Sequence, residues 1–231
     1  MIRQLQDKKV IFFDVGYTLD KPASGDWMLT GKFLELAGAR LKRRGEGEIR
    51  KAAEAGLRYL TQNHLVKTVD EEIRQFCRYY SILSDQLQLG LSEAECEQIA
   101  RDRACNMKNY VPYPGIRSVL ATLYRTHRLG IISDTWPSIE QQLTYIGVSG
   151  YLSFCTFSCF VGVFKPDRRM YLDALEKSGV SAEETVFIDD SVRNLRGAAA
   201  EGILSILIAA DPRADAETDF LKIHDLRELI L

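Results

Sequence analysis

A short apolar run near the amino terminus, residues 9–13, ends directly on Asp14 and is followed by Gly16. Val, Ile and Phe favour a pleated strand, and a run without polar alternation is typical of a strand buried on both faces. Gly16 is where such a strand would break. In open α/β sheets, ligands bind beyond the carboxyl ends of the strands, which is where Asp14 would lie. Taken alone, the pattern is equally consistent with an Asp that caps a turn.

The second half of the chain alternates between apolar runs and amphipathic segments. Strands are predicted over residues 129–133, 185–190 and 203–208, and another apolar run covers 160–164. Helical spacing of apolar residues predicts helices near 116–126, 138–146, 168–178, 194–201 and 224–229. Strands that alternate with helices indicate a parallel sheet with right-handed crossovers. The expected fold class is therefore α/β, with a doubly wound parallel sheet.

From residue 22 to about residue 110, the spacing of apolar residues is typical of helices instead. A first group of apolar residues recurs at helical spacing: Trp27, Phe33, Leu34, Leu36 and Leu41. Further helices are predicted over 48–63, from 69 onward, and from Ser92, the expected cap, to about 108. Four helices with short links suggest a small bundle. We expect an α/β core of residues 1–20 and 111–231 and an inserted helical cap of residues 21–110.

Length, charge and cysteine usage narrow the class of protein. The chain has 231 residues and a formal net charge of −2, which gives no electrostatic case for nucleic acid or an anionic membrane. No apolar run approaches the roughly 20 residues that span a bilayer, and the first residues lack a signal-peptide block. Five scattered cysteines without a Cys-x-x-Cys pair suit a reducing compartment. A cytoplasmic protein is expected, either a monomer or a homodimer.

Three predicted strands each end on a polar side chain: Asp14, Ser133, and the pair Asp189 and Asp190. Lys165 lies on the connection between the second and third of these strands. Parallel neighbouring strands would bring all these groups to one sheet edge. A carboxylate can attack phosphorus, other carboxylates can hold Mg²⁺, and a lysine and a hydroxyl can bind phosphoryl oxygens. The alternative is that each residue has only a structural role.

Four segments resemble the motifs of the haloacid dehalogenase superfamily of phosphohydrolases with a helical cap. They are residues 12–19, 129–135, 162–167 and 186–198, and the resemblance covers nearly the whole chain. It implies an α/β core and a small phosphorylated substrate.

The resemblance also implies roles for individual residues. Asp14 would be the nucleophile and a Mg²⁺ ligand, together with the main-chain carbonyl of Gly16 and with Asp190, while Asp189 supports the metal site. Ser133 and Lys165 would bind the phosphoryl group. Thr18 would hydrogen-bond within the first loop at the substrate site, and Asn194 would brace a loop.

The chain departs from the pattern at Gly16. Phosphatases of this superfamily usually carry a second Asp there, which protonates the leaving group and then activates water. Such general acid–base help is worth typically about 10²–10⁴-fold, so a slow enzyme, or one restricted to acyl or aryl phosphates, is expected. Asp20 or a substrate group is a hypothetical replacement, although Asp20 is equally readable as a plain turn residue.

Two classes of function remain open at this point. The first is a Mg²⁺-dependent phosphohydrolase that acts through an aspartyl-phosphate. The second is a catalytically impaired relative that binds phosphate or a protein and regulates. Dehalogenases carry Asp-x-Tyr-Gly-Thr, whereas this chain has Gly16 before Tyr17, and the acid pair favours a metal, so dehalogenation ranks lower. Phosphonate cleavage would want a lysine from the cap, and it ranks lower because nothing singles out Lys32, Lys42 or Lys51.

Overall fold

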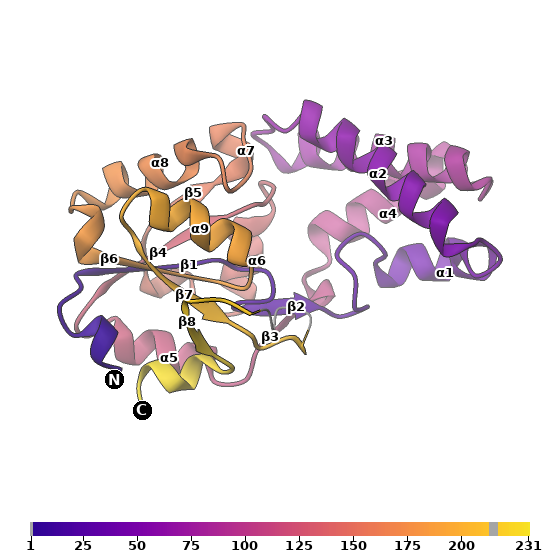
Figure 1. Cartoon of the computed structure of the whole chain (residues 1–231). Coiled ribbons are helices and arrows are strands. Elements are labelled where there is room, and N and C mark those ends of the chain that lie inside the picture. Colours follow the sequence, from indigo (N-terminus) through magenta and orange to yellow (C-terminus); the bar gives the residue numbers. More distant parts are fainter. Residues whose placement is uncertain (1, 213–216) are drawn as a thin grey trace.

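A single parallel sheet forms the core of the computed structural model, which describes residues 2–212 and 217–231. Its strand order is β5-β4-β1-β6-β7-β8, and every neighbouring pair is parallel. The strands are β1 (Val10–Phe13), β4 (Arg128–Ser133), β5 (Leu152–Phe157), β6 (Thr185–Asp189), β7 (Leu204–Ile208) and β8 (Leu221–Ile223). Figure 1 shows this sheet with helices on both faces. The predicted α/β class is confirmed.

Strand β1 explains why the sheet is covered twice. Its alternate residues Ile11 and Phe13 belong to one buried cluster, and Val10 and Phe12 belong to another. Helices α5 (Ile116–Leu123) and α6 (Ile139–Tyr145) cover the first face, and α8 (Arg168–Ser178) and α9 (Val192–Ala200) cover the second. The uninterrupted apolar run in the sequence therefore corresponds to a strand that is buried on both faces.

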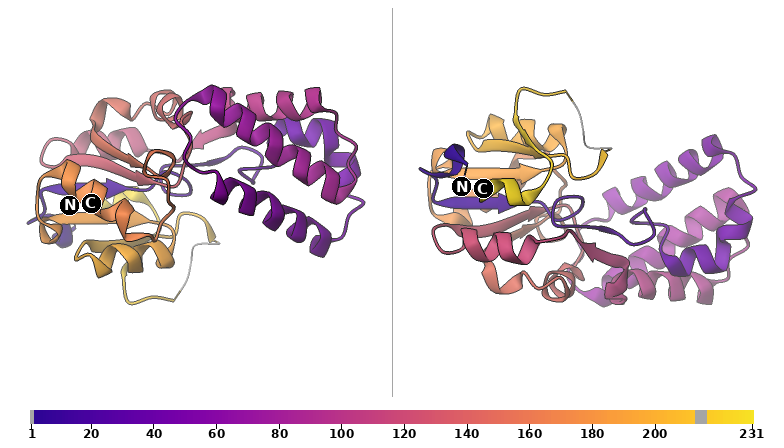
Figure 2. Two further views of the ribbon diagram at one scale, coloured as in Figure 1. Left: turned by 90° about the horizontal axis from the view of Figure 1, so that it is seen from above. Right: turned by 90° about the horizontal axis from the view of Figure 1, so that it is seen from below.

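Four longer helices pack together beside the sheet and have a core of their own. They are α1 (Gly31–Leu41), α2 (Glu46–Gln62), α3 (Val69–Leu87) and α4 (Glu93–Cys105). Thr68 and Ser92 begin α3 and α4 with capping boxes, as predicted for Ser92. Seen from above and from below, these helices extend away from the sheet (Figure 2).

A small antiparallel pair joins the two regions. Strands β2 (Asp20–Pro22) and β3 (Tyr110–Pro112) pair where the chain leaves the sheet and where it returns. Each has three residues and one proline, so neither shows a strand pattern in the sequence.

Other differences from the sequence prediction concern short or exposed elements. The edge strand β5 was missed because only its last two residues are buried. The apolar run 160–164 forms no strand, since its start lies in the helix α7 (Ser158–Val161). The strand β8 was also missed, and the terminal helix is a single 3₁₀ turn. The 3₁₀ helices are η1 (Arg3–Leu5), η2 (Met107–Asn109), η3 (Ser149–Tyr151), η4 (Ala182–Glu184) and η6 (Leu226–Leu229).

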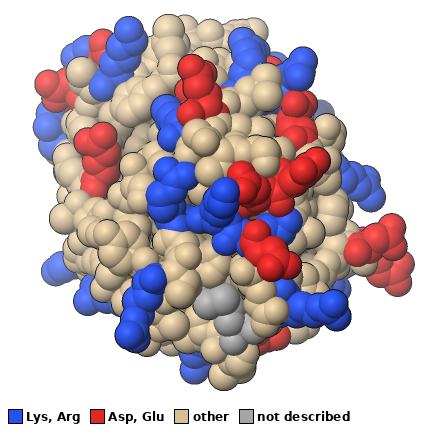
Figure 3. Space-filling view, turned by 90° about the vertical axis from the view of Figure 1, so that its left-hand side faces the viewer, with Lys and Arg blue, Asp and Glu red and all other residues tan. Residues whose placement is uncertain are grey.

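The surface carries charges of both signs. On the face shown in Figure 3, Lys and Arg side chains alternate with Asp and Glu side chains and with uncharged surface. Among the described residues, no helix is both long and apolar enough to cross a bilayer.

Candidate active site

Parallel pairing brings three strand ends together. Phe13 of β1 pairs with Ile131 of β4 on one side and with Ile188 of β6 on the other. The next residues along each strand include Asp14, Ser133 and Asp189, and the main-chain N–H of Asp14 donates to the Ile188 carbonyl at 2.9 Å. The register alone thus places these side chains at one edge of the sheet.

Lys165 connects the carboxylates of this edge. Its Nζ donates to Asp14 Oδ1 at 2.7 Å, to Asp189 Oδ2 at 2.7 Å and to the Ile132 carbonyl at 3.1 Å. Lys165 is almost completely buried, and burial by itself would lower its pKa. The facing carboxylates outweigh burial and hold the pKa of Lys165 above its ordinary value. The ammonium is therefore permanently charged and fixed in position.

The side chains of Asp134 and Asn194 make further hydrogen bonds to Lys165 and Asp189. Asp134 Oδ1 accepts the main-chain N–H of Lys165 at 2.8 Å. Asn194 Nδ2 lies 3.2 Å from each oxygen of Asp189, whose Oδ1 also accepts the Ser191 N–H at 2.7 Å. Asp189 is thus a bridge between Lys165 and the following loop. The loop-bracing contact expected of Asn194 is present.

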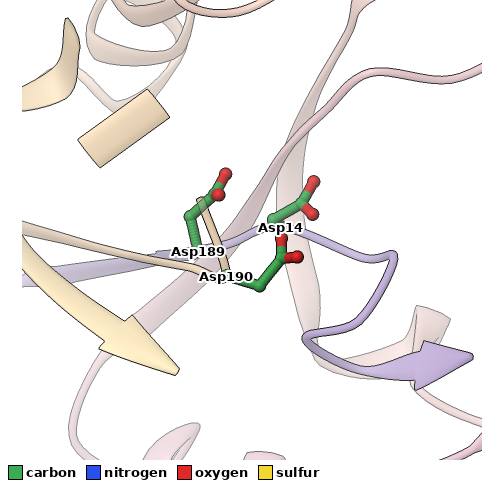
Figure 4. Close-up of side chains that lie close together, drawn as sticks. All are labelled: Asp14, Asp189 and Asp190. Atoms are coloured by element: carbon green, nitrogen blue, oxygen red, sulfur yellow. The ribbon is translucent and has the colours of Figure 1, made fainter. Parts of the chain in front are cut away.

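Three carboxylates could hold a metal ion. Asp14, Asp189 and Asp190 each offer an oxygen, and these oxygens all lie within 4.8 Å of one another. Figure 4 shows the Asp190 side chain turned toward Asp14. Burial, reinforced by the neighbouring carboxylates, raises the pKa of Asp14 to about 7 and that of Asp190 to about 8. Hard oxygen donors that repel one another fit a divalent cation such as Mg²⁺.

Gly16 lies beside an indole ring. A Cβ built on Gly16 would be 3.1 Å from Trp27 Cζ2, which is tighter than ordinary van der Waals contact. Trp27 was predicted to begin a helical stripe, but α1 starts only at Gly31, with Thr30 as its N-cap. The indole instead contacts the ring of Tyr17 at a centroid distance of 5.3 Å. The side chain of Trp27 therefore borders the space that an acid at position 16 would need.

Asp20 is not a plain turn residue. It begins β2, is fully buried, and its Oδ2 accepts from Gln142 Nε2 at 2.7 Å. Its Oδ1 is buried and has no hydrogen-bond partner among the described residues. Burial, with a smaller contribution from Asp14, raises the pKa of Asp20 to about 7 against the opposing hydrogen bond from Gln142. Asp20 does not line the cavity described below, whereas Gln142 does.

Thr18 takes part in the first loop through its main chain. It is fully buried, and its hydroxyl has no hydrogen-bond partner among the described residues. It is also absent from the walls of the cavity. The predicted hydrogen bond within the loop is made by the main chain, where the Thr18 N–H donates to the Val15 carbonyl at 3.2 Å, and substrate contact by Thr18 stays a prediction.

A cavity of about 230 Å³ opens between the sheet edge and the four helices. Its sheet-edge side includes Asp14, Gly16, Ser133, Lys165 and Asp190. The cavity wall also includes residues that the sequence did not single out as site residues: Tyr17, Trp27, Met28, Arg103 and Tyr110. Tyr17 lies in the loop that follows Asp14, whereas the other four reach the cavity through tertiary packing, which no local pattern shows.

A buried ionic network connects the helices to the sheet edge. Glu72 of α3 accepts from Arg103 Nη1 at 3.0 Å and from both the N–H and the hydroxyl of Ser138 at 2.8 Å. Ser138 lies on the loop that follows Ser133 and Asp134. The Arg103 guanidinium also covers the ring of Phe76 at 3.6 Å. The helices are thus fastened to the same loop that shapes the site.

Known proteins share both sequence and fold with this chain. A phosphoserine phosphatase from Thermus thermophilus is 29% identical over 132 residues, and a glyceraldehyde 3-phosphate phosphatase from Methanopyrus kandleri is 26% identical over 131. These alignments cover 54% and 52% of this chain, and the chain spans about half the length of these relatives (52% and 55%).

Solved structures extend the similarity of fold to the whole chain. A 2-haloacid dehalogenase from Pseudomonas syringae superposes with a TM-score of 0.64, at 21% identity and over 96% of both chains. The family profile described as haloacid dehalogenase-like hydrolase matches residues 49–208. The chain belongs to the haloacid dehalogenase-like hydrolase family.

Proposed function

We propose that this protein is a Mg²⁺-dependent phosphohydrolase that acts on a small phosphorylated metabolite through an aspartyl-phosphate. The observation that carries the proposal is the position of Lys165 Nζ, 2.7 Å from both Asp14 and Asp189, beside a third carboxylate. A fixed ammonium next to a cluster of hard oxygen ligands suits the charge of a phosphoryl group better than that of a neutral substrate.

Each residue has a defined part in this proposal. Asp14 attacks phosphorus, and its Oδ1 is held in place by Lys165. Ser133 and Lys165, which both line the cavity, would bind the phosphoryl oxygens. Asp14, Asp190 and the Gly16 carbonyl would hold Mg²⁺, with Asp189 in support. The bound ion would neutralise the charge of the phosphoryl oxygens.

The helices α1–α4 act in this proposal as a cap over the sheet edge. Residues between 21 and 110 supply one side of the cavity, through Trp27, Met28, Arg103 and Tyr110. A cap that encloses the site excludes water and determines which leaving group fits. The relatives named as phosphatases support phosphoryl chemistry.

The test is phosphate release from acetyl phosphate and 4-nitrophenyl phosphate, with and without Mg²⁺. We expect metal-dependent release from the wild type and none from the Asp14→Asn variant, which keeps the shape of the nucleophile. Halide release from 2-chloropropionate, measured in parallel, covers the dehalogenase activity of structural relatives. Halide release without metal, together with no phosphate release, would contradict the proposal.

A second candidate is a phosphate-binding regulator that has lost turnover. The observation that favours it is the close approach of Trp27 to Gly16, because a side chain at position 16 would require the indole to shift. Binding of inorganic phosphate to the wild type, with turnover no higher than that of Asp14→Asn, would support this second candidate.

A further inference from the structure

Aromatic residues form part of the cavity wall. The rings of Trp27 and Tyr110 are stacked, with centroids 6.2 Å apart and planes inclined by 29°. Tyr17 meets Trp27 edge-on at 5.3 Å, and Met28 completes this surface. Such a surface stabilises a planar apolar group placed against it.

This aromatic part of the wall lacks a carboxyl group that could protonate a leaving alkoxide. Between Gly16 and Ser133, the described residues that line the cavity are Tyr17, Trp27, Met28, Arg103 and Tyr110. None of them carries a carboxyl group or an imidazole. Tyr110 donates its hydroxyl to the Arg103 carbonyl at 2.9 Å, and burial raises its pKa to about 12. Arg103 itself is paired with Glu72. A leaving group beside these residues therefore meets aromatic rings and the Arg103 guanidinium but no carboxyl group.

The carboxyl groups that line the cavity belong to Asp14, Asp134 and Asp190, which follow the strands β1, β4 and β6. Asp14 and Asp190 stand at the sheet edge, and Asp134 holds the Lys165 N–H. In an in-line displacement, the leaving oxygen departs on the side of phosphorus opposite to the attacking oxygen. With Asp14 as the nucleophile, the leaving oxygen departs on the side of phosphorus away from the attacking Asp14 oxygen.

Resting on the proposed function, we propose that the substrate is an aryl phosphate, the phosphate ester of a single-ring phenol, whose ring lies against Trp27. The cavity of about 230 Å³ is smaller than the roughly 300–1,000 Å³ of sites for drug-sized ligands, which favours one ring. A phenolate leaves without prior protonation, so the missing acid costs such a substrate little.

The reaction balances without a general acid. The Asp14 carboxylate forms a bond to phosphorus while the bond from phosphorus to the aryl oxygen breaks, and its electron pair leaves with the phenolate. Water then attacks the phosphorus of the aspartyl-phosphate. The carboxylate is released, and both protons of the water remain on the product dihydrogen phosphate.

Four substrates test the effect of the ring and the effect of the leaving group separately. Phenyl phosphate has a ring and a good leaving group, and benzyl phosphate has a ring but an alkoxide leaving group. Acetyl phosphate has a good leaving group without a ring, and cyclohexyl phosphate has neither feature. We expect kcat/KM for phenyl phosphate to exceed that for benzyl phosphate by at least about 10²-fold, which is the size of the missing acid catalysis. Equal values for the two would overturn the proposal.

Variants of Trp27 test the ring contact. In Trp27→Leu, the ratio of kcat/KM for phenyl phosphate to that for acetyl phosphate should fall about 3- to 10-fold, mainly through KM, and Trp27→Phe should recover part of it. Tyr124→Leu removes an exposed aromatic residue far along the chain and should leave the ratio unchanged. An unchanged ratio in folded Trp27→Leu would contradict the placement of the ring.

Asp20 is the remaining alternative source of a proton, reached only through Gln142. Asp20→Asn should keep the ratio of benzyl to phenyl phosphate turnover, because the proposal gives this carboxyl group no part in leaving-group departure. A specific loss of benzyl phosphate turnover would overturn that point. Failure of the proposed function looks different, since no substrate would then release phosphate and Asp14 would not become phosphorylated.

Discussion

Trp27 Cζ2 lies 3.1 Å from the position that a Cβ on Gly16 would take. A side chain at position 16 and the indole of Trp27, from the segment before α1, would therefore compete for the same space. The chain has not merely lost a side chain at position 16. The Trp27 ring crowds the first atom that any side chain there would add.

Restoring an acid at position 16 should therefore require a second change. Gly16→Asp alone forces the indole to shift, and we expect no gain in benzyl phosphate hydrolysis. The double variant Gly16→Asp/Trp27→Ala has room for the carboxyl group, and its kcat/KM should exceed that of Gly16→Asp at least about 10-fold, within the range of general acid catalysis. Trp27→Ala alone is the control. A single Gly16→Asp variant that matches the double variant would show that the indole is no obstacle.

Asp190 should be required for the response of the protein to Mg²⁺. We expect millimolar Mg²⁺ to raise the Tm of the wild type, because an ion that binds only the folded state stabilises it. Asp190→Asn should abolish this shift and raise the Tm of the metal-free protein, since it removes one of three mutually repelling carboxylates. Differential scanning calorimetry with and without Mg²⁺ measures both effects. Asp7→Asn, on the exposed surface, should behave like the wild type; an undiminished Mg²⁺ shift in Asp190→Asn would argue against the metal site.

Lys165 should matter for both stability and chemistry. Lys165→Met leaves Asp14 and Asp189 buried and adjacent without a neutralising charge, so urea unfolding should show a loss of about 3–5 kcal/mol. Phosphate release should fall at least about 10²-fold. Lys177→Met breaks the exposed pair with Asp173 and should cost less than about 1 kcal/mol. Equal losses in the two variants would mean that the buried ammonium has no special weight.

The ion pair of Glu72 and Arg103 should show non-additive energetics. Arg103→Met leaves the Glu72 carboxylate uncompensated in the interior and should destabilise the protein by about 3–5 kcal/mol. The double variant Glu72→Gln/Arg103→Met removes both charges and should lose less than the single variant. Chemical denaturation of the wild type, the two single variants and the double variant gives the coupling energy between Glu72 and Arg103. If the stability losses of the two single variants simply add in the double variant, the predicted coupling is absent.

His64 should make the folded protein sensitive to mild acid. Its Nε2 lies 2.7 Å from Ser158 Oγ, its ring stacks on Phe164, and burial lowers its pKa from 6.5 to about 4. Between these two values the unfolded chain binds a proton that the folded protein does not. Stability contributed by the neutral ring is therefore present above pH 6.5 and is lost as the pH falls toward 4, by up to about 3 kcal/mol.

The neutral variant His64→Gln isolates this effect. The difference in unfolding free energy between wild type and variant should shrink between pH 7.5 and pH 4.5. Parallel stability curves over that range would exclude His64 as the titrating group.

The sheet edge could be predicted from the sequence because parallel strands converge in a fixed way. The apolar runs that end on Asp14, Ser133 and Asp189 are strands β1, β4 and β6, and their register brings these residues together. Lys165 could be added because its connection must pass the same edge. Nothing in that argument depends on detailed packing.

The missed features depend on tertiary placement. Trp27 fitted a helical stripe by its spacing, but Thr30 caps the helix three residues later, and the indole turns toward Gly16. Asp20 is indistinguishable in sequence from an exposed turn residue until Gln142 of α6 is placed against it. The strand β5 escaped notice because an edge strand with half-exposed residues lacks the uninterrupted apolar run of a central strand.

The hydrogen bonds from Ser138 to Glu72 give the four-helix region influence beyond its own boundaries. The peptide unit that receives this contact follows closely on Ser133 and Asp134, and Asp134 in turn fixes the main chain of Lys165. We therefore expect a substitution in the core of α3 or α4 to displace the Lys165 ammonium. A redesign of these helices for a new ligand must therefore also preserve the positions of the reacting groups.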